Sequence, residues 1–425
     1  MIGSLHSSSS SDTDNADARN NSSSGERDAA ALHGGVGRVL AAAAPSTRDL
    51  VLACADLLQR GDLAAARRAA EILLSAASPR GDATDRLAHH FARALVLRVD
   101  AKAGLPFSPR SPAGAATAPS GPYLSFNQIA PFLRFAHLTA NQAILEAVEG
   151  ARRVHILDLD AAHGVQWPPL LQAIAENADP ALGPPEVRIT GAGADRDTLL
   201  RTGNRLRAFA RSIHLPFHFT PLLLSCASSS THHVAGTSTT PSDAVTSLEL
   251  HPDETLAVNC VLFLHKLGGQ DELAAFLKWV KAMAPAVVTV AEREASGGGI
   301  HPIDELPHRV GVAMDHYSAV FEALEATVPP GSRERLAVEQ EVLGREIEAA
   351  VGSTGERWWR GLERWATAAR GAGFAARPLS AFAVSQARLL LRLHYPSEGY
   401  LVQEARGACF LGWQTRPLLS VSSWH

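Results

Sequence analysis

The chain has 425 residues, of which 46% are hydrophobic and 19% are charged, and its formal net charge is −4. This length can bury one large core or two smaller ones, while the acidic balance argues against a protein whose affinity comes from neutralising many phosphates. No apolar run reaches the roughly 18 residues of a membrane-spanning helix and no signal peptide is evident, so we expect a soluble intracellular protein that contacts no membrane.

The N-terminal residues 1–45 are rich in Ser, Asn, Asp and Ala and contain almost no aromatic or branched apolar side chains. Such a segment cannot bury enough apolar surface to fold, so we predict a disordered tail. It has no Lys/Arg cluster of the kind that forms a nuclear localisation signal.

Helical periodicity begins at Ser46 and continues to residue 103 as three apolar stripes. The leucine spacing also suits a coiled coil, but Gly61, Pro79 and Gly81 interrupt it before three or four heptads accumulate. We therefore predict a packed three-helix unit. A Pro- and Gly-rich loop at 104–122 follows, and then one or two helices within 127–149.

A short apolar run from Val154 to Asp158 is followed by acidic residues, Gly164 and a helical pattern after Trp167. This order predicts a buried strand that opens a βαβ unit. The turn after such a strand lies at the carboxyl edge of the sheet, where open α/β sheets bind ligands. Any function of this region should therefore lie around Asp158 to Trp167.

Strand and helix patterns alternate through the middle of the chain, which predicts a doubly wound parallel sheet. The further strands are expected at 187–190, 217–220, 256–264 and 287–291, and the helices between them at 168–178, 199–213 and 271–284. A Ser/Thr-rich surface insertion is expected at 225–247. Helices should follow at 307–327 and 333–351 and around Trp358, Trp359 and Trp365, and short antiparallel strands at 401–405, 410–414 and 418–422 should close the sheet edge.

Catalytic and metal-binding patterns are weak. The four cysteines and the histidines His155, His163, His265 and His316 are widely spaced, so we predict reduced structural thiols and no metal site. Asp158 and Asp160 should point to opposite sides of an extended strand, which makes them a poor acid/base pair. We predict no catalytic residues.

Several sequence blocks, in order, resemble those of the plant GRAS family. The family's VHIID motif is matched by Val154, His155, Ile156, Leu157, Asp158, Gly164, Gln166 and Trp167. Residues 199–219 resemble its second leucine-rich region, and 315–321 with 345–347 resemble its PFYRE blocks. The C-terminal SAW region is matched by Trp365, Gly373, Trp413 and Trp424. Leu157 replaces the second Ile of VHIID, and Ser423 replaces the Ala of SAW.

The resemblance covers residues 46–425 and implies a methyltransferase-like, Rossmann-type α/β sheet under a helical cap. The expected parts are a tail at 1–45, cap helices at 46–103, an α/β core at 123–302, more cap helices at 303–351, and a C-terminal core with the SAW region at 352–425. Leucine content suggests that the cap exposes apolar surface to another protein. The resemblance also implies a nuclear transcriptional regulator that acts as a scaffold for transcription factors and other GRAS proteins.

Within the family, residues 147–169 and 185–220 look most like the lateral suppressor or monoculm subgroup, which controls shoot branching and axillary meristems. A methyltransferase alternative is disfavoured by the loop after the first strand. Methyltransferase loops carry glycines where the backbone approaches the cofactor, but Asp160, Ala162 and Gly164 stand at those positions. We therefore predict no enzyme activity and no bound cofactor.

Direct DNA binding is a further alternative, through phosphate contacts by Arg196, Arg201, Arg205, Arg207 and Arg211. The competing interpretation is a solvated helix face. Finally, Arg196, Leu199 and Asn204 have the spacing of a destruction box, which the anaphase-promoting ubiquitin ligase reads. A helix face with coincidental spacing is the other interpretation.

Overall fold

The computed structural model describes residues 46–105, 120–224, 248–294, 305–352 and 361–425. The predicted tail at 1–45, the predicted insertion at 225–247, and Cys226, Trp358 and Trp359 lie outside these residues. Among the described residues, no helix is both long and apolar enough to span a membrane.

A nine-stranded sheet is ordered β3-β2-β1-β4-β5-β9-β8-β7, with β6 paired to β9. Strands β1 to β5 run parallel, and β9, β8 and β7 continue the sheet antiparallel. The strands are β1 Arg153–Asp158, β2 Glu186–Gly193, β3 Phe217–Leu223, β4 Thr255–Val261, β5 Val287–Arg293, β6 Ala376–Arg377, β7 Tyr400–Ala405, β8 Ala408–Trp413 and β9 Arg416–Trp424. The order 3-2-1-4-5 is that of a doubly wound Rossmann-type sheet, so the predicted fold class is confirmed.

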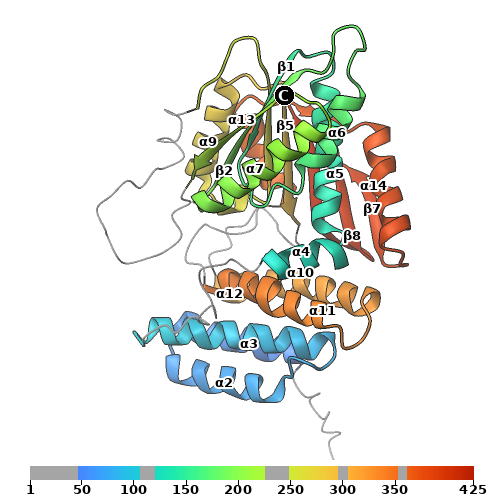
Figure 1. The fold of residues 1–425 in the computed structure, drawn as a ribbon. Helices are drawn as coiled ribbons and strands as arrows, with labels where there is room; N and C mark the ends of the chain where they lie inside the picture. The colour runs from blue at the N-terminus through green and yellow to red at the C-terminus, as the bar shows by residue number, and fades with distance from the viewer. Residues whose placement is uncertain (1–45, 106–119, 225–247, 295–304, 353–360) are drawn as a thin grey trace, which may run out of the picture. The chain divides into compact units, whose positions relative to one another are not determined.

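Helices cover both faces of this sheet (Figure 1). They are α5 Phe132–Ala147, α6 Trp167–Glu176 and α7 Arg196–Ser212 on one face, and α9 Gln270–Ala282 and α13 Leu362–Gly371 on the other. Neighbouring strand residues point to opposite faces, so Ile156 packs with α6 and α7 whereas Leu157 packs with α9 and α13. Both faces are therefore largely apolar, which explains why Val154, Ile156 and Leu157 occur together in β1.

A second group of helices forms the cap: α1 Thr47–Arg60, α2 Leu63–Ala76, α3 Ala83–Lys102, α4 Ser120–Ile129, α10 Leu306–Thr327, α11 Arg333–Val338, a π-helical turn Glu339–Leu343 and α12 Gly344–Gly352. Ser46 begins α1 with a capping box that involves Asp49. Gly61 ends α1 with a φ of 84°, a left-handed conformation that favours glycine. Contacts of α1 with α10 and of α3 with α12 join the two predicted cap segments.

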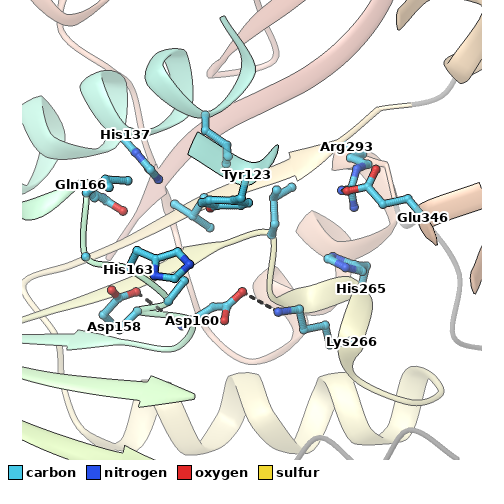
Figure 2. A pocket seen from close by; sticks show the side chains of 17 residues that line it. Tyr123, His137, Asp158, Asp160, His163, Gln166, His265, Lys266, Arg293 and Glu346 are labelled. Atoms are coloured by element: carbon cyan, nitrogen blue, oxygen red, sulfur yellow. Dashed lines mark hydrogen bonds and ion pairs between the residues drawn. The ribbon is translucent and has the colours of Figure 1, made fainter. Parts of the chain in front are cut away.

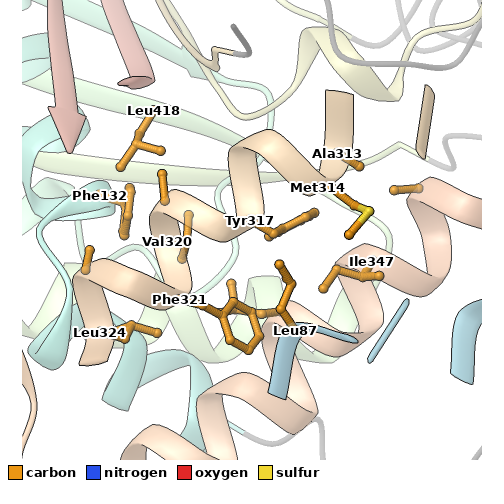
Figure 3. Packing of buried hydrophobic residues seen from close by; sticks show 14 of the residues in the cluster. Leu87, Phe132, Ala313, Met314, Tyr317, Val320, Phe321, Leu324, Ile347 and Leu418 are labelled. Carbon is orange, nitrogen blue, oxygen red and sulfur yellow. The ribbon is translucent and has the colours of Figure 1, made fainter. Parts of the chain in front are cut away.

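The cap has one apolar core. Leu87 of α3, Phe321 of α10 and Ile347 of α12 lie in a cluster that continues to Phe132 and to Leu418 of β9 (Figure 3). The two cap segments therefore bury most of their apolar side chains against each other and the sheet. Leu50 and Ile72 remain exposed, but the apolar surface of the cap is smaller than its leucine content suggested, because that expectation treated each segment as if it packed alone.

Sequence analysis missed α14, Ala381–His394, which packs on α5 and β7. Its start carries a recognisable signal, since Oγ of Ser380 accepts a hydrogen bond from the backbone N–H of Ala383. The helix is apolar on more than one side. Its inner residues are Ala383, Val384, Ala387 and Leu391, and its exposed ones include Phe382, Leu389 and Leu393.

Candidate functional site

The chain turns sharply after β1. Asp158 is the last strand residue, and Leu159 and Asp160 already belong to a turn. The backbone N–H of Asp160 lies 3.5 Å from Oδ1 of Asp158, and both residues line one cavity. The two carboxylates were expected on opposite sides if both residues remained extended, and that condition is not met, because the alternation of side chains ends where the strand ends.

Asp158 is 3% exposed and holds this turn in place. Its carboxylate accepts hydrogen bonds from Nε1 of Trp167 at 2.9 Å and from Nδ2 of Asn259 at 3.1 Å. Nε2 of Gln166 donates to Oδ1 of both Asn141 and Asn259, at 3.1 Å each. Burial raises the pKa of Asp158 to about 7. The Asp, Gln and Trp of the motif thus join β1, the loop, β4 and α5 in one polar network.

A cavity of about 230 Å³ opens where β1, β4 and β5 end (Figure 2). Helices α4, α5 and α12 complete its wall, so it lies between the sheet edge and helices of the cap. Its polar lining residues are Tyr123, His137, Asp158, Asp160, His163, Gln166, His265, Lys266, Arg293 and Glu346. This is the edge at which open α/β sheets bind ligands.

Two ion pairs form part of the cavity wall. Nζ of Lys266 contacts the Asp160 carboxylate, which ties the loop after β1 to the loop after β4. The guanidinium of Arg293, at the end of β5, contacts the carboxylate of Glu346 on α12. The second pair links the sheet edge directly to the cap.

Three other lining groups are neutral near pH 7. Burial lowers the pKa of His137 to about 4, and burial followed by nearby arginines lowers the pKa of His163. Burial also raises the pKa of Tyr123, whose ring centroid lies 5.8 Å from that of His163. Sequence analysis missed Tyr123 and His137, because no local pattern shows that α4 and α5 approach the end of β1.

The four histidines that sequence analysis considered do not converge. His155 is buried beside the Thr190 hydroxyl at 2.8 Å, and His316 is buried 2.8 Å from a backbone carbonyl oxygen. His265 lies 3.1 Å from the Glu292 carboxylate, and His163 lines the cavity. In the part of the chain that the structure describes, no group of three His, Cys, Asp or Glu could hold a metal ion.

The arginines considered for phosphate contacts all lie on α7. Two of them donate to protein carbonyl oxygens, Arg205 to His163 at 2.7 Å and Arg207 to Phe219 at 2.8 Å. Arg196, Arg201 and Arg211 are exposed. Direct phosphate binding by this helix remains a prediction, and it would compete with the carbonyl contacts of two of its five arginines.

The candidate destruction box coincides with the first turns of α7. Asp195 caps the helix by accepting hydrogen bonds from the backbone N–H groups of Asp197 and Thr198. Leu199 is only 1% exposed, while Arg196 and Asn204 are exposed. Recognition by the anaphase-promoting ubiquitin ligase remains a prediction that requires the start of α7 to unfold and release Leu199.

The SAW-region tryptophans are packing residues in the structure. Trp365 and Trp424 are 0% and 3% exposed, and their ring centroids lie 5.3 Å apart in an edge-to-face arrangement. Trp413 packs on the ring of Tyr400 with centroids 4.9 Å apart. Gly373 has a φ of 90° in the turn after α13, which lets the chain reverse there.

We expect the purified protein to show no calorimetric binding of S-adenosylmethionine up to about 1 mM ligand, a concentration that would reveal even weak affinity. The Asp160 carboxylate is paired with Lys266 in this loop, and the side chain of Ala162 occupies a second glycine position. Asp160→Gly combined with Ala162→Gly removes both side chains and serves as the matched variant. Micromolar binding by the wild type would contradict this expectation.

Comparisons of the chain with known proteins all indicate the same protein family. The model of the GRAS domain family matches residues 47–425. The chain is 82% identical over 390 residues to Protein MONOCULM 1 of Oryza sativa subsp. japonica, covering 90% of this chain and 88% of that one. It is 41% identical to Scarecrow-like protein 18 of Arabidopsis thaliana, covering 89% and 91%. The crystal structure of SCL7 from Oryza sativa matches with a TM-score of 0.69 and 34% identity, covering 90% and 100%. The chain therefore belongs to the GRAS domain family.

Proposed function

We propose that this protein is a nuclear transcription regulator that controls shoot branching from axillary meristems as a scaffold for other proteins. The observation that carries the proposal is the 82% identity to MONOCULM 1 of rice across nearly the whole of both chains. The proposed partners are transcription factors and other GRAS proteins, through which the protein reaches DNA. The relatives named above are regulators of this family, which supports a non-enzymatic role.

The outer side of α14 supports contact with a partner protein. Phe382, Leu389 and Leu393 are 59%, 49% and 65% exposed. Phe382, Gln386, Leu389 and Leu393 are separated by four, three and four residues. Side chains at this spacing form a seam along one side of a helix, and such a seam is where another helix packs.

Charge beside this seam indicates which kind of helix would bind. Arg388 pairs with Glu404, whereas Arg392 has no ion-pair partner among the described residues. A second copy of α14 would bring like charges together. We therefore propose an amphipathic partner helix with acidic residues beside its apolar stripe.

The test expresses the full chain in rice plants that lack MONOCULM 1. We expect the wild type to restore tillering, and Leu389→Glu combined with Leu393→Glu to abolish restoration while circular dichroism shows a folded protein. Ile72→Glu is the matched control, because this side chain is 66% exposed on α2. Failure of the wild type, or full restoration by a nuclear-excluded form, would refute the proposed function.

A further inference from the structure

The cavity at the end of β1, β4 and β5 has no role in the proposed scaffold function. Its volume of about 230 Å³ lies below the roughly 300–1,000 Å³ typical of pockets for drug-sized ligands. An occupant would therefore be small, on the scale of a single substituted ring. Leu133, Val261 and Leu262 supply apolar wall between the polar groups.

The charges in the wall disfavour an anion. Lys266 and Arg293 are the cationic side chains of the lining, and each already contacts a carboxylate, that of Asp160 and that of Glu346. An anionic ligand would have to break one of these pairs and then lie near Asp158 as well. Breaking a partly buried pair leaves a carboxylate without compensation, which is costly.

Neutral hydrogen-bonding groups, by contrast, are available. No described residue hydrogen-bonds the ring nitrogens of His137 or the hydroxyl of Tyr123, and both side chains line the cavity (Figure 2). A neutral imidazole offers one donor and one acceptor, and a phenol can do either. The rings of Tyr123 and His163 are tilted by 54° and form an aromatic wall. These groups suit a flat molecule that both donates and accepts hydrogen bonds.

The wall is also held in place before any ligand arrives. Asp158, Trp167, Asn259 and Gln166 are joined by hydrogen bonds of 2.9–3.1 Å, and all four residues are buried. A preformed site loses little conformational entropy on binding, so a small ligand can bind there despite its few contacts.

We infer that this cavity binds a small, uncharged, planar molecule of the carboxamide or nitrogen-heterocycle class, held by His137 of α5 and Tyr123 of α4 against the end of β1. Because Tyr123 comes from α4 and Glu346 from α12, an occupied cavity would also fasten the sheet edge to helices of the cap. Occupancy would therefore stabilise the arrangement of these helices.

The test is a matched pair of probes that differ only in charge: nicotinamide, which is neutral at pH 7, and nicotinate, which is an anion. Saturation-transfer NMR on the full chain measures binding of each probe. We expect nicotinamide to bind at millimolar concentration and nicotinate at least about tenfold more weakly, the factor that corresponds to about 1.4 kcal/mol.

Two cavity variants and one control variant test whether nicotinamide binds in this cavity. His137→Phe and Tyr123→Phe each remove hydrogen-bonding atoms while keeping an aromatic ring, and each should weaken nicotinamide about tenfold. His214→Phe changes an exposed histidine in the turn after α7 and should have no effect. Nicotinamide should also slow hydrogen exchange in α4 of the wild type.

Absence of nicotinamide binding, equal binding of nicotinate, or unchanged binding in both folded cavity variants would each overturn the inference. None of these results depends on tillering, so the inference can fail while the proposed function stands. Conversely, a failure to restore tillering would leave the probe results unaffected.

Discussion

Replacing Trp424 with alanine is expected to destabilise the folded protein by about 3–5 kcal/mol, the usual cost of deleting a large buried aromatic side chain. Trp424 is 3% exposed and packs edge-to-face on Trp365, and Nε1 donates to Oγ of Ser422 at 3.1 Å. Its backbone also pairs with Val288 of β5. The substitution would therefore leave a cavity where the C-terminal strand joins the parallel sheet.

Urea unfolding followed by circular dichroism measures this cost. Phe382→Ala is the control, because it truncates an aromatic ring that is 59% exposed and should change stability by no more than about 0.5 kcal/mol. A folded domain is typically stable by only about 5–15 kcal/mol, so Trp424→Ala should also lower the yield of soluble protein. Equal unfolding midpoints for the two variants would show that the SAW region does not support the core.

Glu339→Ala is expected to cost a similar amount, about 3–5 kcal/mol, for an electrostatic reason. Nε of Arg86 lies 2.9 Å from Oε2 of Glu339, and these side chains are 2% and 1% exposed. Glu339 opens the π-helical turn between α11 and α12, and Arg86 belongs to α3. Removing the carboxylate would leave a buried guanidinium whose remaining ionic partner among the described residues is Glu325, and that side chain is 43% exposed.

A double substitution separates the effect of pairing from that of packing. Arg86→Met combined with Glu339→Met should be closer to the wild type in stability than Glu339→Ala, because it removes both members of the closest buried pair and keeps apolar volume. Arg335, which lies 3.8 Å from Glu339, keeps Glu325 as a partner. Arg60→Ala is the surface control. It breaks an exposed pair with Asp56 and should cost no more than about 1 kcal/mol. A loss below about 1 kcal/mol for Glu339→Ala would mean that water reaches Arg86.

Sequence periodicity alone was enough to predict the principal strands and most helices. The apolar run before Asp158 predicted a strand buried on both faces, and the alternation after it predicted that β1 to β5 form a parallel sheet. These features are local, because the position of a residue in the 2.0-residue period of a strand or the 3.6-residue period of a helix decides on which face its side chain lies. The absence of glycine at residues 160 and 162 could likewise be read directly from the sequence.

Long-range contacts were decided only by the tertiary structure. Asp160 meets Lys266 across 106 positions, and Arg293 meets Glu346 across 53, so neither pair forms a local pattern. The same holds for β9, the last strand in the chain, which lies inside the sheet between β5 and β8. Amphipathic periodicity indicates that one face of a helix is buried, but it does not identify the residues that cover this face. The burial of most apolar side chains of the cap and the exposure of one side of α14 therefore depended on how distant helices pack.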